Sequence, residues 1–458
     1  MSVGQYTISE ETMDQLCRSL SNASMGRVVA DLKRFGLQGE DNSQRAVMKN
    51  GATPMHYTSV VYAQGDGENR KYFLNLEASL FMTAILLGAG FDPGAKARAY
   101  VHPVTYDRIS SDKYSKLALE NPEKASEYTE YEMSPAQRIA LRKFNILYAH
   151  SLTDEYKSLN KKMQGAVMSF EQLDDLAKQS PELARAFCSD RLVAFYKKAQ
   201  EVVYTGPELH CDFRVKFGKL TVNPMLYNYV MEKTKEGDFW SVYACIRKYK
   251  LYGKRALRLV DAYGHTPVTA SLPAGEPMGN LASKNELRRC QMMLCLWLGA
   301  GVPATEKASI FKRKNHFSLL DHRTIDLDLK KEEYKADDLM QADMDPIEIL
   351  MCRKKLLLDG RGYRTIYTNY CANPDEIQKE AILKADPVLR KAQQYDTFAA
   401  FVKRLSLPDR FDGRYLVSTS GEKEGGVWKG FVEKNGKPGN PVMARKLYAE
   451  RFIRGGIV

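Results

Sequence analysis

A motif that occurs twice constrains the fold of this 458-residue chain more than any other feature of its sequence. Residues 51–54 (Gly-Ala-Thr-Pro) and 264–267 (Gly-His-Thr-Pro) each precede an apolar segment, and each segment later ends in Gly-Ala-Gly. Glycine suits a tight turn, threonine caps a helix, and proline fits the first helical position. The closing glycines suit the left-handed conformation that follows a helix. The pattern therefore predicts two similar units, each with a turn and two helices.

These two units resemble the ankyrin-repeat family, in which a Gly-x-Thr-Pro turn opens each repeat. The resemblance covers about residues 21–98 and 225–305, and both units carry extra residues between their helices. It implies a helical solenoid in which each repeat packs on its neighbour. It also implies that His56 is the structural histidine that joins neighbouring repeats by hydrogen bonds. The motif residues are Gly51, Thr53, Pro54, His56, Gly264, Thr266 and Pro267.

Outside the two units, the sequence predicts further helices and a small β element. Helix-start signals occur at 134–137, 169–172 and 180–183, and alternation over 413–433 predicts a β-hairpin. The expected fold class is therefore mainly α, an ankyrin-type helical solenoid with a helical insert domain and a small α+β C-terminal cap. We expect four domains. Residues 1–102 form an N-terminal cap with the first repeat block, and 103–222 form a mostly helical insert. Residues 223–322 form a second repeat block, and 323–458 form a helical plus β-hairpin cap.

Composition excludes several classes of protein. There is no apolar run long enough for a transmembrane helix, and the first residues lack the basic and apolar regions of a cleaved signal peptide. The eight cysteines are scattered, which favours reduced intracellular thiols over disulfides or a zinc site. We therefore expect an intracellular protein with no metal and no cofactor. The net charge of +12 favours acidic partners, nucleic acid or anionic surfaces.

Catalytic motifs are scarce. The sequence has no Gly-x-x-x-x-Gly-Lys-Ser/Thr, Gly-x-Gly-x-x-Gly, Gly-x-Ser-x-Gly or His-Glu-x-x-His motif. The remaining catalytic hypothesis is a cysteine nucleophile with a histidine base inside the predicted insert. Two of its candidates are adjacent in a strand-like segment, where their side chains would point to opposite faces. The candidates are Cys188, Cys211, His150 and His210.

Two regions are candidates for partner binding. The run 247–258 has six basic residues, two tyrosines and no acid, a composition that suits phosphate contacts and base stacking. The ankyrin resemblance implies that the tips of the turns before each Gly-x-Thr-Pro motif also contact partners. The candidate partner-binding residues are Lys49, Asn50, Arg247, Lys248, Lys254, Arg255, Asp261, Ala262 and Tyr263.

The sequence favours a protein–protein interaction scaffold of ankyrin type. Degenerate repeats with large insertions resemble ankyrin proteins that intracellular bacteria inject into host cells. This resemblance implies a host protein partner with an acidic surface and secretion by a non-classical route. Two alternatives stay open: a cysteine-dependent hydrolase in the insert, with the repeats delivering substrate, and nucleic-acid binding through 247–258.

Overall fold

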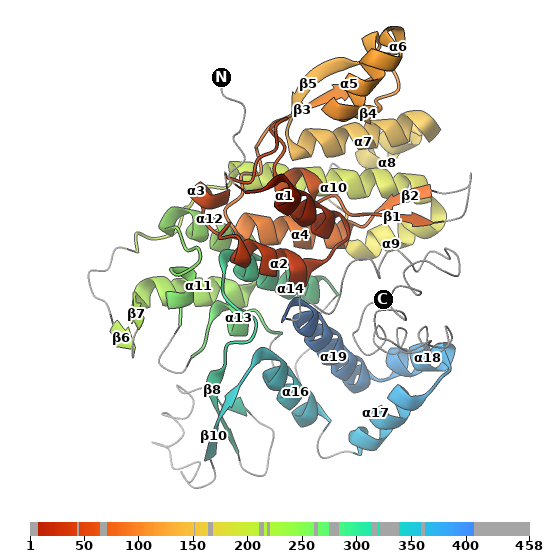
Figure 1. Cartoon of the computed structure of the whole chain (residues 1–458). Coiled ribbons are helices and arrows are strands. Elements are labelled where there is room, and N and C mark those ends of the chain that lie inside the picture. Colours follow the sequence, from red (N-terminus) through yellow and green to blue (C-terminus); the bar gives the residue numbers. More distant parts are fainter. Residues whose placement is uncertain are drawn as a thin grey trace, which may run out of the picture.

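A computed structural model gives the arrangement of the chain (Figure 1). It describes residues 8–43, 45–64, 71–150, 152–163, 168–209, 215–217, 220–260, 264–273, 284–313, 319–320, 339–358 and 362–406. Over these residues the protein is mainly α-helical, as the sequence predicts. The predicted β-hairpin at 413–433 lies outside the described residues.

The first half of the chain begins with helices and a small hairpin. These elements are α1 (Glu10–Ser21), α2 (Met25–Arg34), α3 (Glu40–Ser43), the 3-10 turn η1 (Pro54–Tyr57), β1 (Val61–Gln64), β2 (Lys71–Leu74) and α4 (Leu76–Gly88). A three-stranded sheet and six further helices follow. They are β3 (Ala97–Val101), β4 (Arg108–Ile109), α5 (Ser111–Glu120), α6 (Pro122–Ser126), β5 (Thr129–Met133), α7 (Pro135–His150), α8 (Thr153–Lys162), α9 (Phe170–Gln179) and α10 (Pro181–Glu201).

The second half begins with a short hairpin and then repeats part of this order. It contains β6 (Val215–Phe217), β7 (Leu220–Val222), α11 (Pro224–Glu236), α12 (Phe239–Tyr249), η3 (Ala256–Arg258), α13 (Pro267–Ala270) and α14 (Lys284–Ala300). It continues with β8 (Ala308–Arg313), β9 (Leu319–Leu320), β10 (Leu339–Met344), α16 (Pro346–Leu357), α17 (Tyr363–Ala372), α18 (Glu376–Ala385) and α19 (Pro387–Ser406).

The two halves are internal copies of one another. Helices α1, α2 and α4 correspond to α11, α12 and α14, and the two Gly-x-Thr-Pro turns correspond as well. Sheet register repeats too, because Ala97 pairs with Met133 in the first copy and Ala308 with Met344 in the second. Each of these methionines is followed by a helix-start residue and a proline. We call residues 9–201 copy 1 and residues 223–406 copy 2.

This duplication divides the chain differently from the sequence prediction. The segment 103–222 does not stand apart as an insert, because its sheet and helices complete copy 1. The segment 323–458 likewise begins with the matching part of copy 2. The two units at 21–98 and 225–305 are therefore the first halves of two larger copies. Their motifs are detectable because tight turns restrict residue type more than helix surfaces do.

The copies meet through α4 and α14 with two-fold, reciprocal contacts. A Cβ atom on Gly88 would lie 1.9 Å from the carbonyl oxygen of Leu296, and one on Gly299 would lie 1.9 Å from that of Ile85. Reciprocal pairs of this kind are the signature of a two-fold relation, whereas stacked repeats present different faces to each other. The two three-stranded sheets, β4-β3-β5 and β10-β8-β9, accordingly lie at opposite ends of the molecule (Figure 1). The copies do not continue one another as a solenoid.

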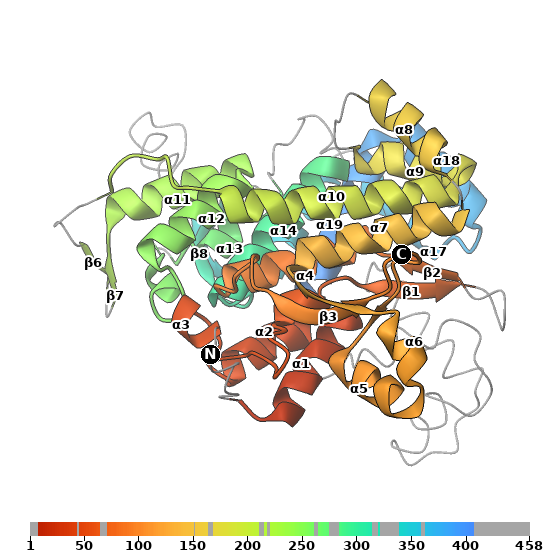
Figure 2. The ribbon, with the colours of Figure 1, turned by 90° about the horizontal axis from the view of Figure 1, so that it is seen from above.

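Within each copy, the first helices are arranged as two adjacent pairs. In copy 1, α1 packs against η1 and α2 packs against α4. In copy 2, α11 packs against α13 and α12 packs against α14. The long helices α7 and α10 then run side by side along the outside of copy 1 (Figure 2).

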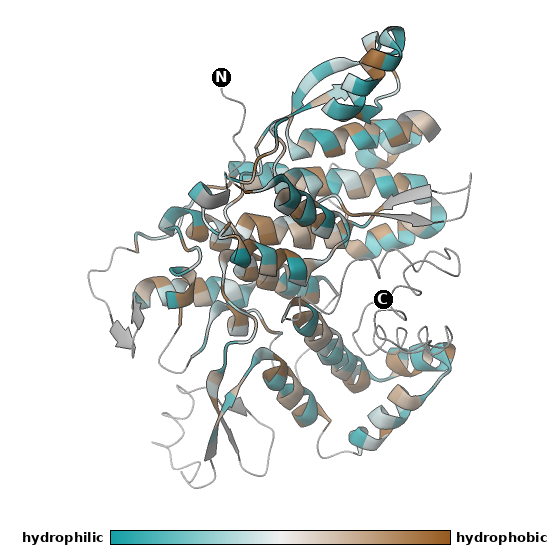
Figure 3. Cartoon of the chain, in the orientation of Figure 1, coloured by the Kyte–Doolittle hydropathy of each residue, from teal (hydrophilic) through white to brown (hydrophobic). Residues whose placement is uncertain are grey.

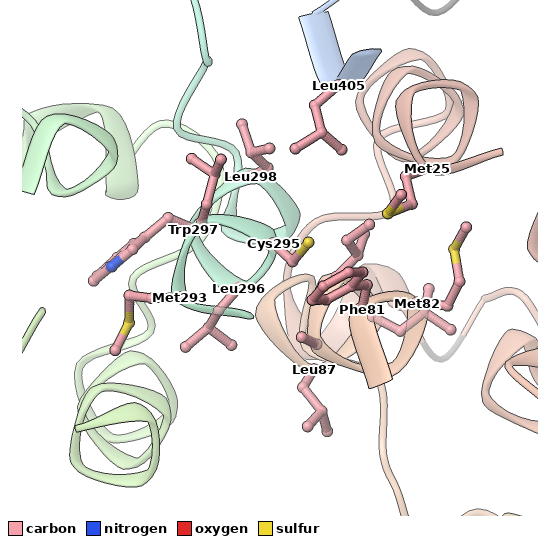
Figure 4. Close-up of a cluster of buried hydrophobic side chains, with 14 of the residues drawn as sticks. Met25, Phe81, Met82, Leu87, Met293, Cys295, Leu296, Trp297, Leu298 and Leu405 are labelled. Atoms are coloured by element: carbon pink, nitrogen blue, oxygen red, sulfur yellow. The ribbon is translucent and has the colours of Figure 1, made fainter. Parts of the chain in front are cut away.

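The core lies where the copies join. Every residue of α4 except Glu77 is buried, and most of these residues are apolar (Figure 3). The buried hydroxyls of Ser79 and Thr83 donate to the carbonyl oxygens of Asn75 and Ser79. Figure 4 shows Phe81 and Leu87 of α4 among side chains of α14, with Met25 of α2 and Leu405 of α19 nearby. The last helix of each copy also reaches the other copy. Helix α19 packs against α2, and the ring of Phe195 in α10 lies 4.8 Å from that of Trp240 in α12.

We expect Gly88→Ala and Gly299→Ala to destabilise the protein by similar amounts, at least about 2 kcal/mol each, because an added methyl group would separate α4 from α14. The control is Gly94→Ala, since an added Cβ there first meets the flexible Asp92 side chain at 3.3 Å. Thermal unfolding of the three variants tests this. A loss in only one of the two helix variants would contradict the two-fold contact.

Candidate functional site

A cleft of about 480 Å³ opens in copy 1 between the end of α1, the η1 turn, the β3–β4 pair and α7. Its walls are rich in cationic and polar side chains. The lining residues include His56, Tyr57, Arg98, Arg108, Arg138 and Arg142.

Helix α7 supplies one wall of the cleft. Its start is fixed by a capping pair, in which the Ser134 backbone N–H donates to Gln137 Oε1 at 2.8 Å. Arg138, Arg142 and Asn145 follow at spacings of four and three residues, which places them on one face of the helix.

The β3–β4 turn supplies the opposite wall. Asn145 Nδ2 donates to the carbonyl oxygen of Thr105 at 3.0 Å and to Asp107 Oδ1 at 2.9 Å, so α7 holds this turn in place. Arg108 follows directly and pairs with Val101 across the strands. The turn thus brings a third arginine towards the two on α7.

Positive charge in the cleft is poorly compensated. Four arginines line it against one carboxylate, that of Asp107, and this carboxylate already accepts hydrogen bonds from Thr105 and Asn145. In the described part of the chain, no carboxylate lies within 4.0 Å of Arg108, Arg138 or Arg142. Arg98 lies 3.9 Å from Glu130.

The arginines also disfavour one another's charge. Burial and then the Arg108 charge lower the pKa of Arg138 to about 10, and the same causes lower the pKa of Arg142. Burial also lowers the pKa of Arg108. The side chains of Arg108 and Arg142 nevertheless keep accessible surface, and Arg138 is half-buried. All three guanidinium groups stay charged at neutral pH, and Arg108 and Arg142 are exposed to a ligand.

Arg138 has an unused hydrogen-bond donor. Its Nε atom is buried and has no partner, while its Nη2 atom donates to the Arg98 carbonyl oxygen at 3.4 Å, a long contact. A buried donor without an acceptor is unfavourable. An incoming acceptor would relieve this.

His56 borders the cleft as a neutral side chain. Its Nδ1 accepts from the Thr53 backbone N–H at 3.1 Å, so its Nε2 carries the proton and donates to the Met133 carbonyl oxygen at 3.3 Å. Burial first, and then the charges of Arg138 and Arg108, lower its pKa to about 4. The histidine predicted to be structural therefore joins the η1 turn to the end of β5 within one copy.

Copy 2 lacks two of the three arginines Arg108, Arg138 and Arg142. By register and helix position, Arg108 corresponds to Leu319 and Arg138 to Ile349. Arg142 corresponds to Arg353, whose Nη1 donates to the Pro273 carbonyl oxygen at 2.6 Å inside the protein. Since copy 2 forms the same fold with apolar residues at two of these positions, the fold itself does not require the arginines of copy 1.

A second group of arginines, Arg191 and Arg288, differs from the cleft arginines because its side chains contact other groups within the protein. The guanidinium groups of Arg191 and Arg288 lie on the Phe170 ring, at 3.8 and 3.7 Å from its centroid. Arg288 also forms two hydrogen bonds with the Glu77 carboxylate, at 3.1 and 3.3 Å. These groups join α14 of copy 2 to copy 1. In the described part of the chain, Arg108, Arg138 and Arg142 have no ring or carboxylate of this kind.

The predicted turn tip lies beside the cleft. Asn50 lines the cleft, and the backbone carbonyl of Lys49 accepts from Arg98 Nη2 at 3.4 Å. The other tip, with Asp261, Ala262 and Tyr263, lies outside the described residues.

The basic run 247–258 is separate from the cleft, on α12 and the turn after it. Lys248 Nζ lies 2.8 Å from Glu208 Oε1 and 4.5 Å from the Tyr204 ring centroid. Arg247 lies 5.7 Å from the Tyr243 ring centroid. Lys254 and Arg255 are exposed. Two basic residues of the run, Arg247 and Lys248, thus contact other side chains of the protein.

The cysteine hypothesis gains no support from Cys188. Burial raises the pKa of its thiol to about 11, so the nucleophilic thiolate is scarce at neutral pH. His210 and Cys211 lie outside the described residues, and His150 is the last residue of α7. Among the described residues, no cluster of three or more His, Cys, Asp or Glu side chains suits a metal ion. In the same part of the chain, no helix combines the length and apolar character needed to span a bilayer.

No protein-family model, curated protein or solved structure matches this chain. The ankyrin resemblance therefore rests on the repeated motifs alone.

Because the folded-state pKa of His56 is about 4, below its ordinary value of 6.5, this residue stabilises the fold above pH 6.5, and the contribution is lost as the pH falls towards 4. The matched variant is His56→Thr, because Thr269 of copy 2 accepts the equivalent bond from Thr266 N–H at 3.0 Å.

We expect wild type to lose about 1 to 2 kcal/mol more stability than His56→Thr between neutral pH and about pH 5. Urea unfolding at both pH values measures this. Identical losses in the two proteins would contradict a buried neutral His56.

Proposed function

We propose that this chain is a non-catalytic recognition protein that binds an acidic segment of a partner protein in the copy 1 cleft. The observation that carries the proposal is the group of Arg108, Arg138 and Arg142, which face one cleft without a carboxylate within 4.0 Å in the described part of the chain. An acidic ligand would supply the missing charge and the missing acceptors.

The difference between the copies supports a role in binding. Interactions needed for folding should persist in both copies, yet Leu319 and Ile349 replace two of the arginines in copy 2. Residues that the fold does not need, but that gather in a concave surface, are candidates for recognition. The position of Asn50 in the cleft wall agrees with the predicted role of its turn in partner binding.

Recognition would follow from a preorganised surface. Helix α7 holds Arg138 and Arg142 one turn apart, and Asn145 fixes the turn that carries Arg108. Planar guanidinium groups in fixed positions bind carboxylate or phosphate oxygens in pairs, with little ordering on binding. A scaffold of this kind matches the function predicted from the sequence, with the contact surface at the cleft.

The test is affinity capture from a eukaryotic cell lysate with three proteins. The cleft variant Arg108→Leu with Arg138→Ile introduces the copy 2 residues. The control, Lys254→Gln with Arg255→Gln, also removes two positive charges, but from the exposed turn after α12. Thermal unfolding establishes that each variant folds.

We expect the cleft variant to capture about tenfold less partner than wild type, because two charge-assisted contacts are lost. The control should capture as much partner as wild type. Equal losses in both variants would mean that only overall charge matters. Loss in the control alone would move the binding site to the basic run. Retention in all three proteins would refute the cleft as the site.

A further inference from the structure

We infer that the cleft of copy 1 binds a phosphate monoester, held by Arg108, Arg138 and Arg142, and that the phosphate is the feature of the ligand that it selects. This inference rests on the proposed function, since it names the chemistry that the same cleft recognises.

The number of arginines favours phosphate over carboxylate. A carboxylate has one negative charge and two oxygens, which a single guanidinium group can bind in a bidentate pair. A phosphate monoester carries a charge of about −1.5 to −2 near neutral pH and offers three terminal oxygens. Three guanidinium groups on two different elements, β4 and α7, match three oxygens that point in different directions.

The unsatisfied donors point to the same ligand. Arg138 Nε is buried without a partner, and its neighbour Nη2 makes only the long contact to Arg98. These two atoms form one edge of the guanidinium fork, the edge that binds two oxygens of an oxyanion. Asp107 does not meet this need, because no carboxylate in the described part of the chain lies within 4.0 Å of Arg138.

Neutral donors complete the lining. The hydroxyl groups of Ser59 and Ser110 line the cleft, as does Tyr57. Burial raises the pKa of Tyr57 to about 12, so its hydroxyl stays neutral, and its proton is donated to Met48 Sδ at 3.1 Å. The two serine hydroxyls can add hydrogen bonds, and none of these groups adds negative charge that would repel a dianion.

The cleft is larger than a bare phosphate requires and has apolar lining. Its volume of about 480 Å³ is in the range of small-molecule sites, and Tyr106, Ile139 and Leu141 contribute to its wall. An organic group attached to the phosphate would contact this part of the wall. The expected ligand is therefore an ester of phosphate, either a phosphorylated side chain or a small phosphorylated metabolite.

The experiment is calorimetric titration of the full chain with four probes: phenyl phosphate, adenosine monophosphate, inorganic phosphate and glutarate. Glutarate is a dicarboxylate, so it tests whether charge alone is enough. The variants are the double variant Arg108→Leu with Arg138→Ile, and Arg138→Lys, which keeps the charge but removes the planar fork. The control is Lys254→Gln with Arg255→Gln.

We expect a phosphate ester to bind at least about tenfold more tightly than glutarate, and Arg138→Lys to reduce its affinity by about tenfold. Tighter binding of phenyl phosphate would favour a phosphorylated side chain, and tighter binding of adenosine monophosphate would favour a nucleotide. Equal affinities for esters and glutarate, or no binding of either ester, would overturn the inference.

Failure here is distinguishable from failure of the proposed function. If the double variant loses its captured partner while no phosphate ester binds, the cleft recognises carboxylates, and only the phosphate inference falls. Treating the lysate with phosphatase before capture gives an independent measure, since a phosphate-dependent partner should be lost from wild type. Capture that phosphatase leaves unchanged would also overturn the phosphate inference.

Discussion

The structure depends on a close approach of two backbones, those of α4 and α14. Side chains usually hold packed helices 8–10 Å apart, and here Gly88 and Gly299 remove the side chain at both crossing points. The approach leaves no space for solvent, so α4 is almost entirely buried and mostly apolar. It also fixes the two-fold relation of the copies, which in turn brings α19 onto α2 and α10 towards α12.

What the copies share shows which interactions the fold needs. Lys143 Nζ lies 2.7 Å from Asp190 in copy 1, and Lys354 Nζ lies 2.6 Å from Asp396 at the matching position of copy 2. Each lysine also faces a tyrosine ring, with centroid distances of 5.1 and 4.7 Å. Removing one partner of such a partly buried pair is costly, which explains why both members are retained together. Arg108 and Arg138 show no comparable retention, since Leu319 and Ile349 take their places in copy 2.

The sequence predicted the helical class and several helix starts, because Thr-Pro turns, capping boxes and helix-ending glycines are local signals. It did not reveal the full duplication, since the matched helices share packing positions but few residue types. The spacing of Arg138, Arg142 and Asn145 was a helical signal for one cleft wall. No local pattern places Arg108 opposite them, because that depends on how the β3–β4 turn packs on α7.

The cleft also explains why sequence and fold give different kinds of information about function. Three cations that face one cavity repel each other, and the Arg108 charge adds to burial in lowering the pKa values of Arg138 and Arg142. A fold has no reason to maintain such an arrangement when apolar residues at the same positions, as in copy 2, build the same sheet and helix. We infer that something outside the chain offsets the unfavourable charge. An anionic ligand would do so because its charge would stabilise all three arginines at once.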